Sequence, residues 1–392
     1  MIFSRTDNSV ISRWWWTVDR WLLALIFILM CTGLWLILTA SPAVAERIGL
    51  ESYHFVKRQL VFLTMGLITV VGISLMPRIW VRRIAIVGFP ITLALIVFVL
   101  FAGPEIKGAR RWIQLPSFTL QPSEFMKPMF IVTVGWLLSA GFDDTKIPAK
   151  RMAMVIFVIV VGLLVLQPDF GQAMLVSMVF VGMLTIAGMP LLWVVSAGLA
   201  GIFGVGVGYL FLPHVTSRID RFLDPSKGDN FQTEKSLEAF QSGGLLGRGP
   251  GEGVVKLNLP DAHTDYIFAV LGEEFGAIAC VMLLLLFVSI VVRGLSNLLE
   301  EEDPFSVLAV SGLLMQFGFQ ALINIGVNLS LLPAKGMTLP FISYGGSSML
   351  ALAIGMGMVL SLTRHNRFLR KENMTGSWRG DQWNNSLNEG GT

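Results

Sequence analysis

The sequence predicts an all-α protein that crosses a membrane many times. Of its 392 residues, 54% are hydrophobic and only 14% are charged, whereas a soluble domain has about 25% charged residues. It also contains long runs without Asp, Glu, Lys or Arg, and about 20 apolar residues suffice for a helix to cross a bilayer. Such a chain has too little polar surface to fold as a water-soluble globule.

Uncharged runs locate the expected helices. The nine runs are 21–45, 59–77, 84–104, 128–142, 152–168, 170–217, 275–292, 304–334 and 336–363. The run 170–217 is too long for one crossing, and Gly188-Met189-Pro190 interrupts it, so it counts as two helices. We therefore expect ten transmembrane helices.

The same runs divide the chain into three parts. A cytoplasmic segment 1–20 precedes a membrane domain 21–363, and a polar cytoplasmic tail 364–392 is expected to be disordered. Ala43-Val44-Ala45 is also compatible with a signal-peptidase site, but the first apolar stretch exceeds a signal peptide and further spans follow, which favours an uncleaved first helix.

Charge counts orient the helices. An even number of crossings puts both termini on one side; with the N-terminus inside, fifteen Lys and Arg are cytoplasmic and fourteen external. Long loops follow the positive-inside rule poorly, and leaving out the loop 214–264 gives fifteen against eight. We therefore expect a cytoplasmic N-terminus and two long external connections, 103–123 and 214–264.

Composition excludes several classes of protein. Two cysteines, both in apolar runs where a buried side chain is expected, exclude a disulfide scaffold. A net charge of +3 gives no reason to expect nucleic acid, and no zinc or phosphate-loop spacing occurs. No protein metal site is predicted.

Ionisable residues at the edges of spans are the candidate site residues, because a bilayer excludes charge. Glu124 and Lys127 stand three apart and can pair on one helix face, either at the headgroup level or in a site. Asp169, in the short connection after Pro168, is either a helix cap or a site residue. We expect Asp265 in the first turn of a helix that Thr264 caps, where the helix dipole keeps a carboxylate ionised.

The two glutamates that follow Asp265 mark its helix as central. At 100° per residue, Glu273 lies roughly 80° and Glu274 roughly 180° around the helix from Asp265. They are therefore not expected to face one partner, and a structural role in hydrogen bonds between helices is favoured for both.

External cations suggest an anionic ligand. They stand in four groups: Lys107, Arg110 and Arg111; Arg218 and Arg221; Arg248 in a glycine-rich loop; and Lys335 beside Gly336. Phosphate is the natural ligand for Arg, Lys and exposed backbone donors; contacts to lipid headgroups are the alternative. These residues indicate an enzyme or transporter that handles a phosphorylated amphiphile, without choosing between the two.

Several motifs together resemble the SEDS family of bacterial cell-envelope proteins (shape, elongation, division and sporulation). They are Leu259 to Glu274 with the glycine loop before it, Arg218 to Pro225, Asn324 to Asn328 leading to Pro333-Ala334-Lys335-Gly336, and Leu339 to Ser348. The likeness spans all ten helices, so the resemblance implies the SEDS fold. Ala262, the 339–348 run and the Trp-rich N-terminus resemble division-type more than elongation-type members.

The resemblance implies a peptidoglycan glycosyltransferase that polymerises lipid II and releases undecaprenyl pyrophosphate. The family's essential aspartate falls on Asp265, which would act as base on the incoming sugar hydroxyl. The substrate-binding residues implied for the pyrophosphate are Arg58, Arg111, Lys127 and Lys335, with Glu124 holding Lys127 and Asp169 as a further polar partner. Mg²⁺ or Mn²⁺ on the pyrophosphate is expected, because hard cations suit phosphate oxygens.

The resemblance also implies partners and a location. These are a class B penicillin-binding protein as the cross-linking transpeptidase, other membrane proteins of the division machinery, and the division septum of the cytoplasmic (inner) membrane, with the active site outside. An elongation-type polymerase shares this chemistry. A lipid II flippase and a pure scaffold are the alternatives from other classes. The flippase predicts that Asp265→Ala leaves polymer synthesis intact in a reconstituted system, and the scaffold predicts that substitutions of Asp265 are tolerated.

Overall fold

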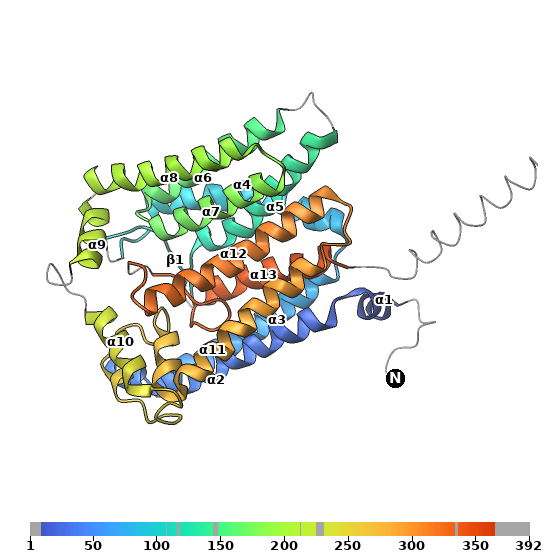
Figure 1. The fold of residues 1–392 in the computed structure, drawn as a ribbon. Helices are drawn as coiled ribbons and strands as arrows, with labels where there is room; N and C mark the ends of the chain where they lie inside the picture. Colours follow the sequence, from blue (N-terminus) through green and yellow to red (C-terminus); the bar gives the residue numbers. More distant parts are fainter. Residues whose placement is uncertain are drawn as a thin grey trace, which may run out of the picture.

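The computed structural model describes residues 9–106, 108–115, 118–143, 148–211, 213–224, 231–333 and 336–364. Ten long helices run along a common direction (Figure 1). They are α2 (Arg20–Arg47), α3 (His54–Ser74), α4 (Arg78–Ala102), α5 (Pro122–Asp143), α6 (Ala149–Leu166), α7 (Phe170–Ile186), α8 (Leu191–Phe211), α11 (Ile267–Ser296), α12 (Pro304–Asn328) and α13 (Gly346–Leu362). Each expected run overlaps one of these helices.

Length and composition qualify six of the described helices to cross a membrane: α2, α3, α4, α6, α11 and α12. Helices α7 and α13 are apolar but shorter. The protein is therefore a multi-pass helical membrane protein, and the count of ten crossings stays a prediction. Cys31 is exposed on α2 and Cys280 is half-buried, so the expectation that both are buried is wrong for Cys31. An uncharged thiol is tolerated on a face that lipid can cover.

The centre of the bundle is α12. In its most apolar stretch 72% of the residues are buried, against 28% in α11. The low value for α11 comes from the part of the helix beyond the glutamates. Every residue from Ile267 to Glu274 is buried, so the expected central position holds for the segment that carries Glu273 and Glu274 and not for the rest of the helix.

The two long connections lie at one end of the bundle and α1 (Val10–Thr17) at the other (Figure 1). The first connection contains a two-residue antiparallel hairpin, β1 (Ile113–Gln114) with β2 (Thr119–Leu120). The second contains α9 (Pro213–Leu223), α10 (Phe231–Gly243) and the 3-10 turn η2 (Val255–Leu257). All predicted site residues in the described chain belong to this loop-bearing end.

Helix α11 is broken at Gly276, where φ is +78° and ψ is −179°. A break inside a bilayer leaves backbone groups that must find partners. The carbonyls of Glu273 and Glu274 accept from Arg248 N and Gly249 N, both at 3.0 Å. Beyond the break, Ala277 N and Ile278 N donate to the carbonyls of residues 244 and 245, at 3.0 and 3.3 Å. The glycine loop therefore replaces the missing helical bonds.

Candidate active site

Asp265 lies in a turn that leads into α11, two residues before the helix begins at Ile267. The expected cap is wrong: Tyr266 occupies the N-cap position, and the hydroxyl of Thr264 donates to Asp261 O at 3.1 Å. Residues 261–266 form a turn, and Asp261 at its start adopts φ +54°. Asp265 is half-buried.

Two buried amides of α12 fix the backbone of Asp265. The Nδ2 atoms of Asn324 and Asn328 each donate to the carbonyl of Asp265 at 2.9 Å. Asn324 Nδ2 also donates to Met337 O at 2.7 Å, and Asn328 Oδ1 accepts from Ala269 N at 3.2 Å. One face of α12 thus binds the Asp265 turn, the start of α11 and the segment before α13.

The segment 336–345 lies directly beside the Asp265 carboxylate. A Cβ placed on Gly336 would be 3.4 Å from Asp265 Oδ2. Tyr344 N donates to His263 O at 2.9 Å, which joins this segment to the Asp265 turn a second time. Phe341 has φ +59°, and a Cβ on Gly33 of α2 would lie 2.3 Å from its carbonyl oxygen. The absence of a side chain at Gly33 is what allows the turn to pack there.

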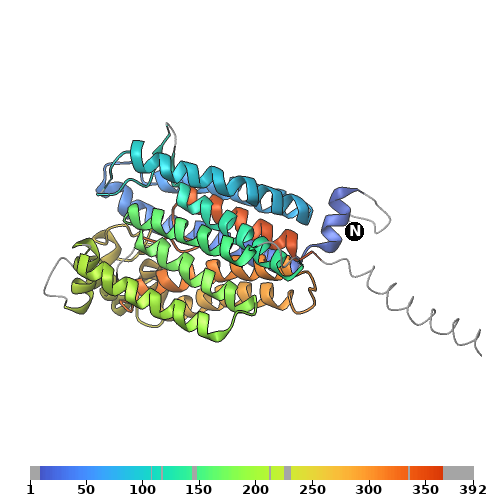
Figure 2. The same cartoon turned by 90° about the horizontal axis from the view of Figure 1, so that it is seen from above.

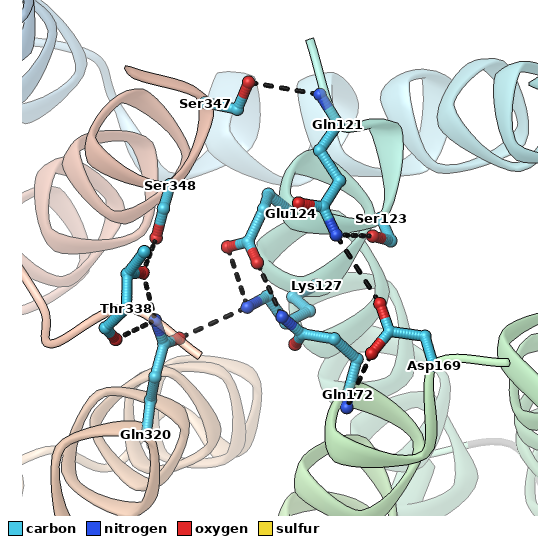
Figure 3. A network of polar contacts seen from close by, with 10 residues as sticks. All are labelled: Gln121, Ser123, Glu124, Lys127, Asp169, Gln172, Gln320, Thr338, Ser347 and Ser348. Carbon is cyan, nitrogen blue, oxygen red and sulfur yellow. Dashed lines mark hydrogen bonds and ion pairs between the residues drawn. The ribbon is translucent and has the colours of Figure 1, made fainter. Parts of the chain in front are cut away.

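Buried polar side chains from α5, α7, α12 and α13 form a second part of the site (Figure 3). The predicted pair is confirmed: Lys127 Nζ lies 2.8 Å from Glu124 Oε2. Glu124 Oε1 also accepts from Gln172 Nε2 at 2.6 Å, and Lys127 Nζ donates to Gln320 Oε1 at 3.2 Å. Gln320 Nε2 donates in turn to Thr338 O at 3.1 Å. The pair therefore reaches the segment beside Asp265 through one intervening side chain.

Asp169 joins this group from the start of α7. It is the N-cap, accepting from Gln172 N at 3.5 Å, and its Oδ2 also accepts from Gln121 Nε2 at 3.5 Å. Arg111 NH1 lies 3.7 Å from the same carboxylate. Burial raises the pKa of Asp169, and the positive charge of Arg111 opposes that rise. Asp169 is thus both a helix cap and a member of the polar network.

Arg111 binds the turn between α6 and α7 through two backbone carbonyls. Its Nε donates to Gln167 O at 3.0 Å and its NH2 to Pro168 O. The side chain is only 16% exposed. In this structure Arg111 joins the hairpin connection to α7.

Glu273 and Glu274 face the same short segment, contrary to expectation. Glu273 accepts the backbone N–H groups of residues 254 and 255 at 2.7 Å and of Lys256 at 2.9 Å. Glu274 forms an ion pair with the Lys256 side chain. A compact turn with a long lysine side chain offers donors on two sides of the helix, which helical angles alone do not show. The expected hydrogen bonds between helices are not what these two side chains form, since their partners belong to the loop before α11.

The remaining predicted cations differ in exposure. Arg58 is exposed in the first turns of α3, at the same end of the bundle. Lys335 lies outside the described residues, although its neighbour Gly336 adjoins Asp265. Lys127 is 1% exposed. Only Arg58 of these therefore offers an exposed charge in the described chain.

Two aromatic side chains beside Asp265 have shifted pKa values. Burial lowers the pKa of His263 to about 4; its ring lies 4.3 Å from that of Phe55 and 5.5 Å from that of Tyr344. Burial, and then the charge of Asp265, raise the pKa of Tyr266 to about 12. Both groups are therefore neutral near pH 7, and the carboxylates of Asp261 and Asp265 are the other ionisable groups of this turn.

Comparison with known proteins identifies the family. A family model described as cell cycle protein, whose name joins FtsW, RodA and SpoVE, matches residues 20–368. The chain belongs to this family. It is 44% identical over 363 residues to a probable peptidoglycan glycosyltransferase FtsW of Caulobacter vibrioides, covering 92% of this chain and 93% of that protein. A second protein of that name, from Trichlorobacter lovleyi, is 35% identical over 88% of this chain and 93% of its own length.

Solved structures share the fold of this FtsW/RodA/SpoVE chain. One comes from work described as structural coordination of polymerization and crosslinking by a peptidoglycan synthase complex. It has a TM-score of 0.73 and 28% identity, covering 88% of this chain and 97% of that one. The rod shape determining protein RodA of Thermus thermophilus has a TM-score of 0.67 and 26% identity, with coverage of 88% and 96%. The SEDS fold is therefore established.

Sequence reasoning missed the amides of α12 as site residues. Gln320, Asn324 and Asn328 follow one another at intervals of four and are 0–2% exposed. A polar residue every fourth position inside an uncharged run places a hydrogen-bonding stripe on one helix face. That spacing is the sequence signal from which these three amides could have been predicted as site residues.

Proposed function

We propose that this chain is a peptidoglycan glycosyltransferase that polymerises lipid II at the outer face of the cytoplasmic membrane, with Asp265 as general base. The observation that carries the proposal is the half-buried Asp265, whose backbone is fixed by Asn324 and Asn328 and whose carboxylate adjoins Gly336. The relatives' names support the reaction.

The proposed step is an inverting displacement. Asp265 takes the proton from the 4-hydroxyl of the GlcNAc of an incoming lipid II. The hydroxyl oxygen forms a bond to C1 of the MurNAc at the lipid-linked end of the growing strand. The bond between C1 and the pyrophosphate oxygen breaks, and undecaprenyl pyrophosphate leaves. A base on the acceptor side is consistent with inversion at C1. A fixed backbone keeps the carboxylate at hydrogen-bond distance from that hydroxyl.

Cations near the same segment would stabilise the leaving pyrophosphate. Arg58 is the exposed candidate. Lys335 lies outside the described residues but directly precedes Gly336 in the chain. Lys127 and Glu124 would act by ordering the segment beside Asp265 through Gln320 and Thr338, since their side chains are buried. Arg111 and Asp169 would hold the hairpin connection against α7. Charge that develops on the leaving oxygen is stabilised best by groups already in place.

A divalent cation fits the substrate better than the protein. Among the described residues no three His, Cys, Asp or Glu side chains are close enough to hold a metal ion. Mg²⁺ or Mn²⁺ would bind pyrophosphate oxygens, which are hard ligands, and would neutralise part of the leaving group's charge.

The proposed setting is the division septum, beside a class B penicillin-binding protein and other division proteins. The solved complex that shares this fold is described as coordinating polymerization with crosslinking, and such a partner carries the crosslinking. Identity of 44% to a division-type relative against 26% to a RodA supports the division role over elongation. A fluorescent fusion that localises along the side wall instead of the septum would reverse this assignment.

The test is polymerisation in vitro. The chain is co-purified with its class B penicillin-binding protein, given lipid II with Mg²⁺ or Mn²⁺ in detergent, and the products are sized. Asp265→Ala should lower the rate by roughly 10²–10⁴-fold, the range of general-base catalysis. Glu51→Gln removes an exposed carboxylate at the same end and should leave the rate unchanged.

Two other outcomes discriminate the alternatives. Equal polymer from wild type and Asp265→Ala would reject Asp265 as the base. No polymer from either, together with lipid II movement across vesicles that contain the chain, would favour the flippase.

A further inference from the structure

Helix α1 lies across the end of the bundle that is opposite the candidate active site. In Figures 1 and 2 this dark-blue helix runs transverse to the long helices. Ser9 caps it by accepting from Ser12 N at 3.2 Å. The buried Trp14 ties it to the bundle, because its Nε1 donates to Ser74 Oγ of α3 at 2.9 Å. An orientation transverse to the spans places α1 in the plane of the membrane surface.

The first turn of α1 exposes two aliphatic side chains. Val10 and Ile11 are 61% and 54% exposed, whereas Trp14, one turn later, is 8% exposed and packs against the bundle. Trp15, four residues after Ile11, is half-buried on the side of Ile11. Exposed aliphatic residues beside tryptophans on a helix in the membrane plane are typical of the headgroup region, where apolar side chains reach the acyl chains.

Arg364 is held beside the last turn of α1. Its Nε donates to Thr17 Oγ1 at 3.0 Å, and its NH1 donates to the carbonyls of Ser74 and Leu75 at 3.4 and 3.2 Å. Thr17 Oγ1 donates to Arg13 O at 2.9 Å. Arg13 stands one turn before Thr17 on the same face of α1, and its charge acts on Arg364.

No carboxylate in the described chain neutralises these two charges. Asp19, six residues after Arg13, is already bound: its Oδ2 accepts from Arg293 Nε at 2.7 Å and Asn297 Nδ2 at 2.6 Å. Burial, and then the charge of Arg13, lower the pKa of Arg364. Two close guanidinium groups without an acid leave a local excess of positive charge, which an anion would stabilise.

We propose that Arg13 and Arg364 bind the phosphate of an anionic phospholipid whose acyl chains cover Val10 and Ile11. Guanidinium groups bind phosphate oxygens bidentately, and Arg364 is already oriented by three acceptors. The adjacent apolar face selects a phosphate that carries acyl chains over a soluble one. The site belongs to the end of the bundle away from the proposed chemistry and does not depend on the proposed function.

Native mass spectrometry of the detergent-solubilised full chain tests this site. The probes are phosphatidylglycerol, phosphatidylcholine of the same acyl chains, and inorganic phosphate. Arg13→Gln should weaken phosphatidylglycerol binding about ten-fold, the effect of losing one charge-assisted contact. Arg83→Gln is the matched control: it removes an exposed arginine of α4 that lies over its own Trp80 ring at 5.4 Å, and should change binding less than about two-fold.

Two further variants separate binding from folding. Arg364→Lys keeps the charge but loses the fork geometry and should also weaken binding, whereas Ile11→Gln should lower the preference for lipid over inorganic phosphate. An equal loss of phosphatidylglycerol binding in Arg13→Gln and Arg83→Gln would overturn the proposal. So would equal affinity for phosphatidylglycerol and phosphatidylcholine, or inorganic phosphate that competes at the lipid's own concentration.

Discussion

The loop-bearing half of the molecule contains two buried lysine–glutamate pairs with different connections. Lys127 and Glu124 lie on one helix and contact side chains of α7 and α12. Lys256 comes from a loop and pairs with Glu274, while the adjacent Glu273 accepts three backbone N–H groups of the same loop. The first pair joins helices to one another; the second fixes a loop to a broken helix.

The two pairs have different structural tasks, which explains why each keeps its buried charges. The loop must replace the helical bonds lost at Gly276, and a fixed polar turn does so. The cross-helix pair instead reaches Thr338, in the segment beside Asp265, through Gln320. The loop pair should therefore affect stability above all, and the cross-helix pair should affect the position of the active-site segment as well.

The largest expected effect is on the loop pair. Lys256→Met leaves the fully buried Glu274 without its cation, and removal of one partner of a buried pair costs about 3–5 kcal/mol. Thermal unfolding in detergent should show a large fall in the transition temperature. Lys256→Met combined with Glu274→Leu should restore at least half of the loss, since no charge then stays buried alone. If the double variant is as unstable as the single one, the pair is not what fixes the loop.

The helix break itself comes next. Gly276→Ala places a Cβ 2.3 Å from the carbonyl oxygen of Leu245 at a φ of +78°, which should cost about 3 kcal/mol in unfolding free energy. Gly72→Ala is the control, because a Cβ there meets nothing within 4 Å and should stabilise α3 by up to about 1 kcal/mol. A Gly276→Ala chain as stable as wild type would mean that the break is not required.

The cross-helix pair predicts a smaller loss of stability with a loss of activity. Gln320→Leu removes the acceptor of Lys127 and the donor to Thr338, which should cost about 1–3 kcal/mol. Polymerisation by folded protein should fall about ten-fold because the segment beside Asp265 loses one of its supports. Gln316→Leu, one turn earlier and also buried, should lower activity less; equal activity losses would remove Gln320 from the site.

The smallest effect is a pH dependence beside Asp265. His263 has a folded pKa of about 4 because it is buried, with Asp261 raising and Arg47 lowering it, whereas an unfolded histidine titrates near 6.5. The stability that comes from burying this histidine in its neutral form is complete above about pH 6.5 and is lost as the pH falls toward 4. At pH 5.5 the loss of unfolding free energy is about 1 kcal/mol. His263→Gln should flatten the change in unfolding temperature between pH 7.5 and 5.5. An unchanged slope would contradict a neutral, buried His263.

Several features followed from local patterns. Uncharged runs located the long helices, because a helix in lipid must be apolar along its length. The pairing of Glu124 with Lys127 followed from their spacing on one helix. The cap at Asp169 followed from an acid before a helix start. Motif resemblance marked the Asp265 turn and the segments that contact it.

Other features depended on where distant segments meet. Angles on an ideal helix misplaced the partners of Glu273 and Glu274, since a loop folded back over both. The α12 amides were missed because their partner, the Asp265 carbonyl, lies about 60 positions earlier in the chain and is brought to them by packing. The sequence by itself determined which segments are apolar and which residues are chemically able to act. Only the tertiary structure decided which buried polar groups meet, because in a low-dielectric interior each must find a partner and that choice depends on the packing of all the helices.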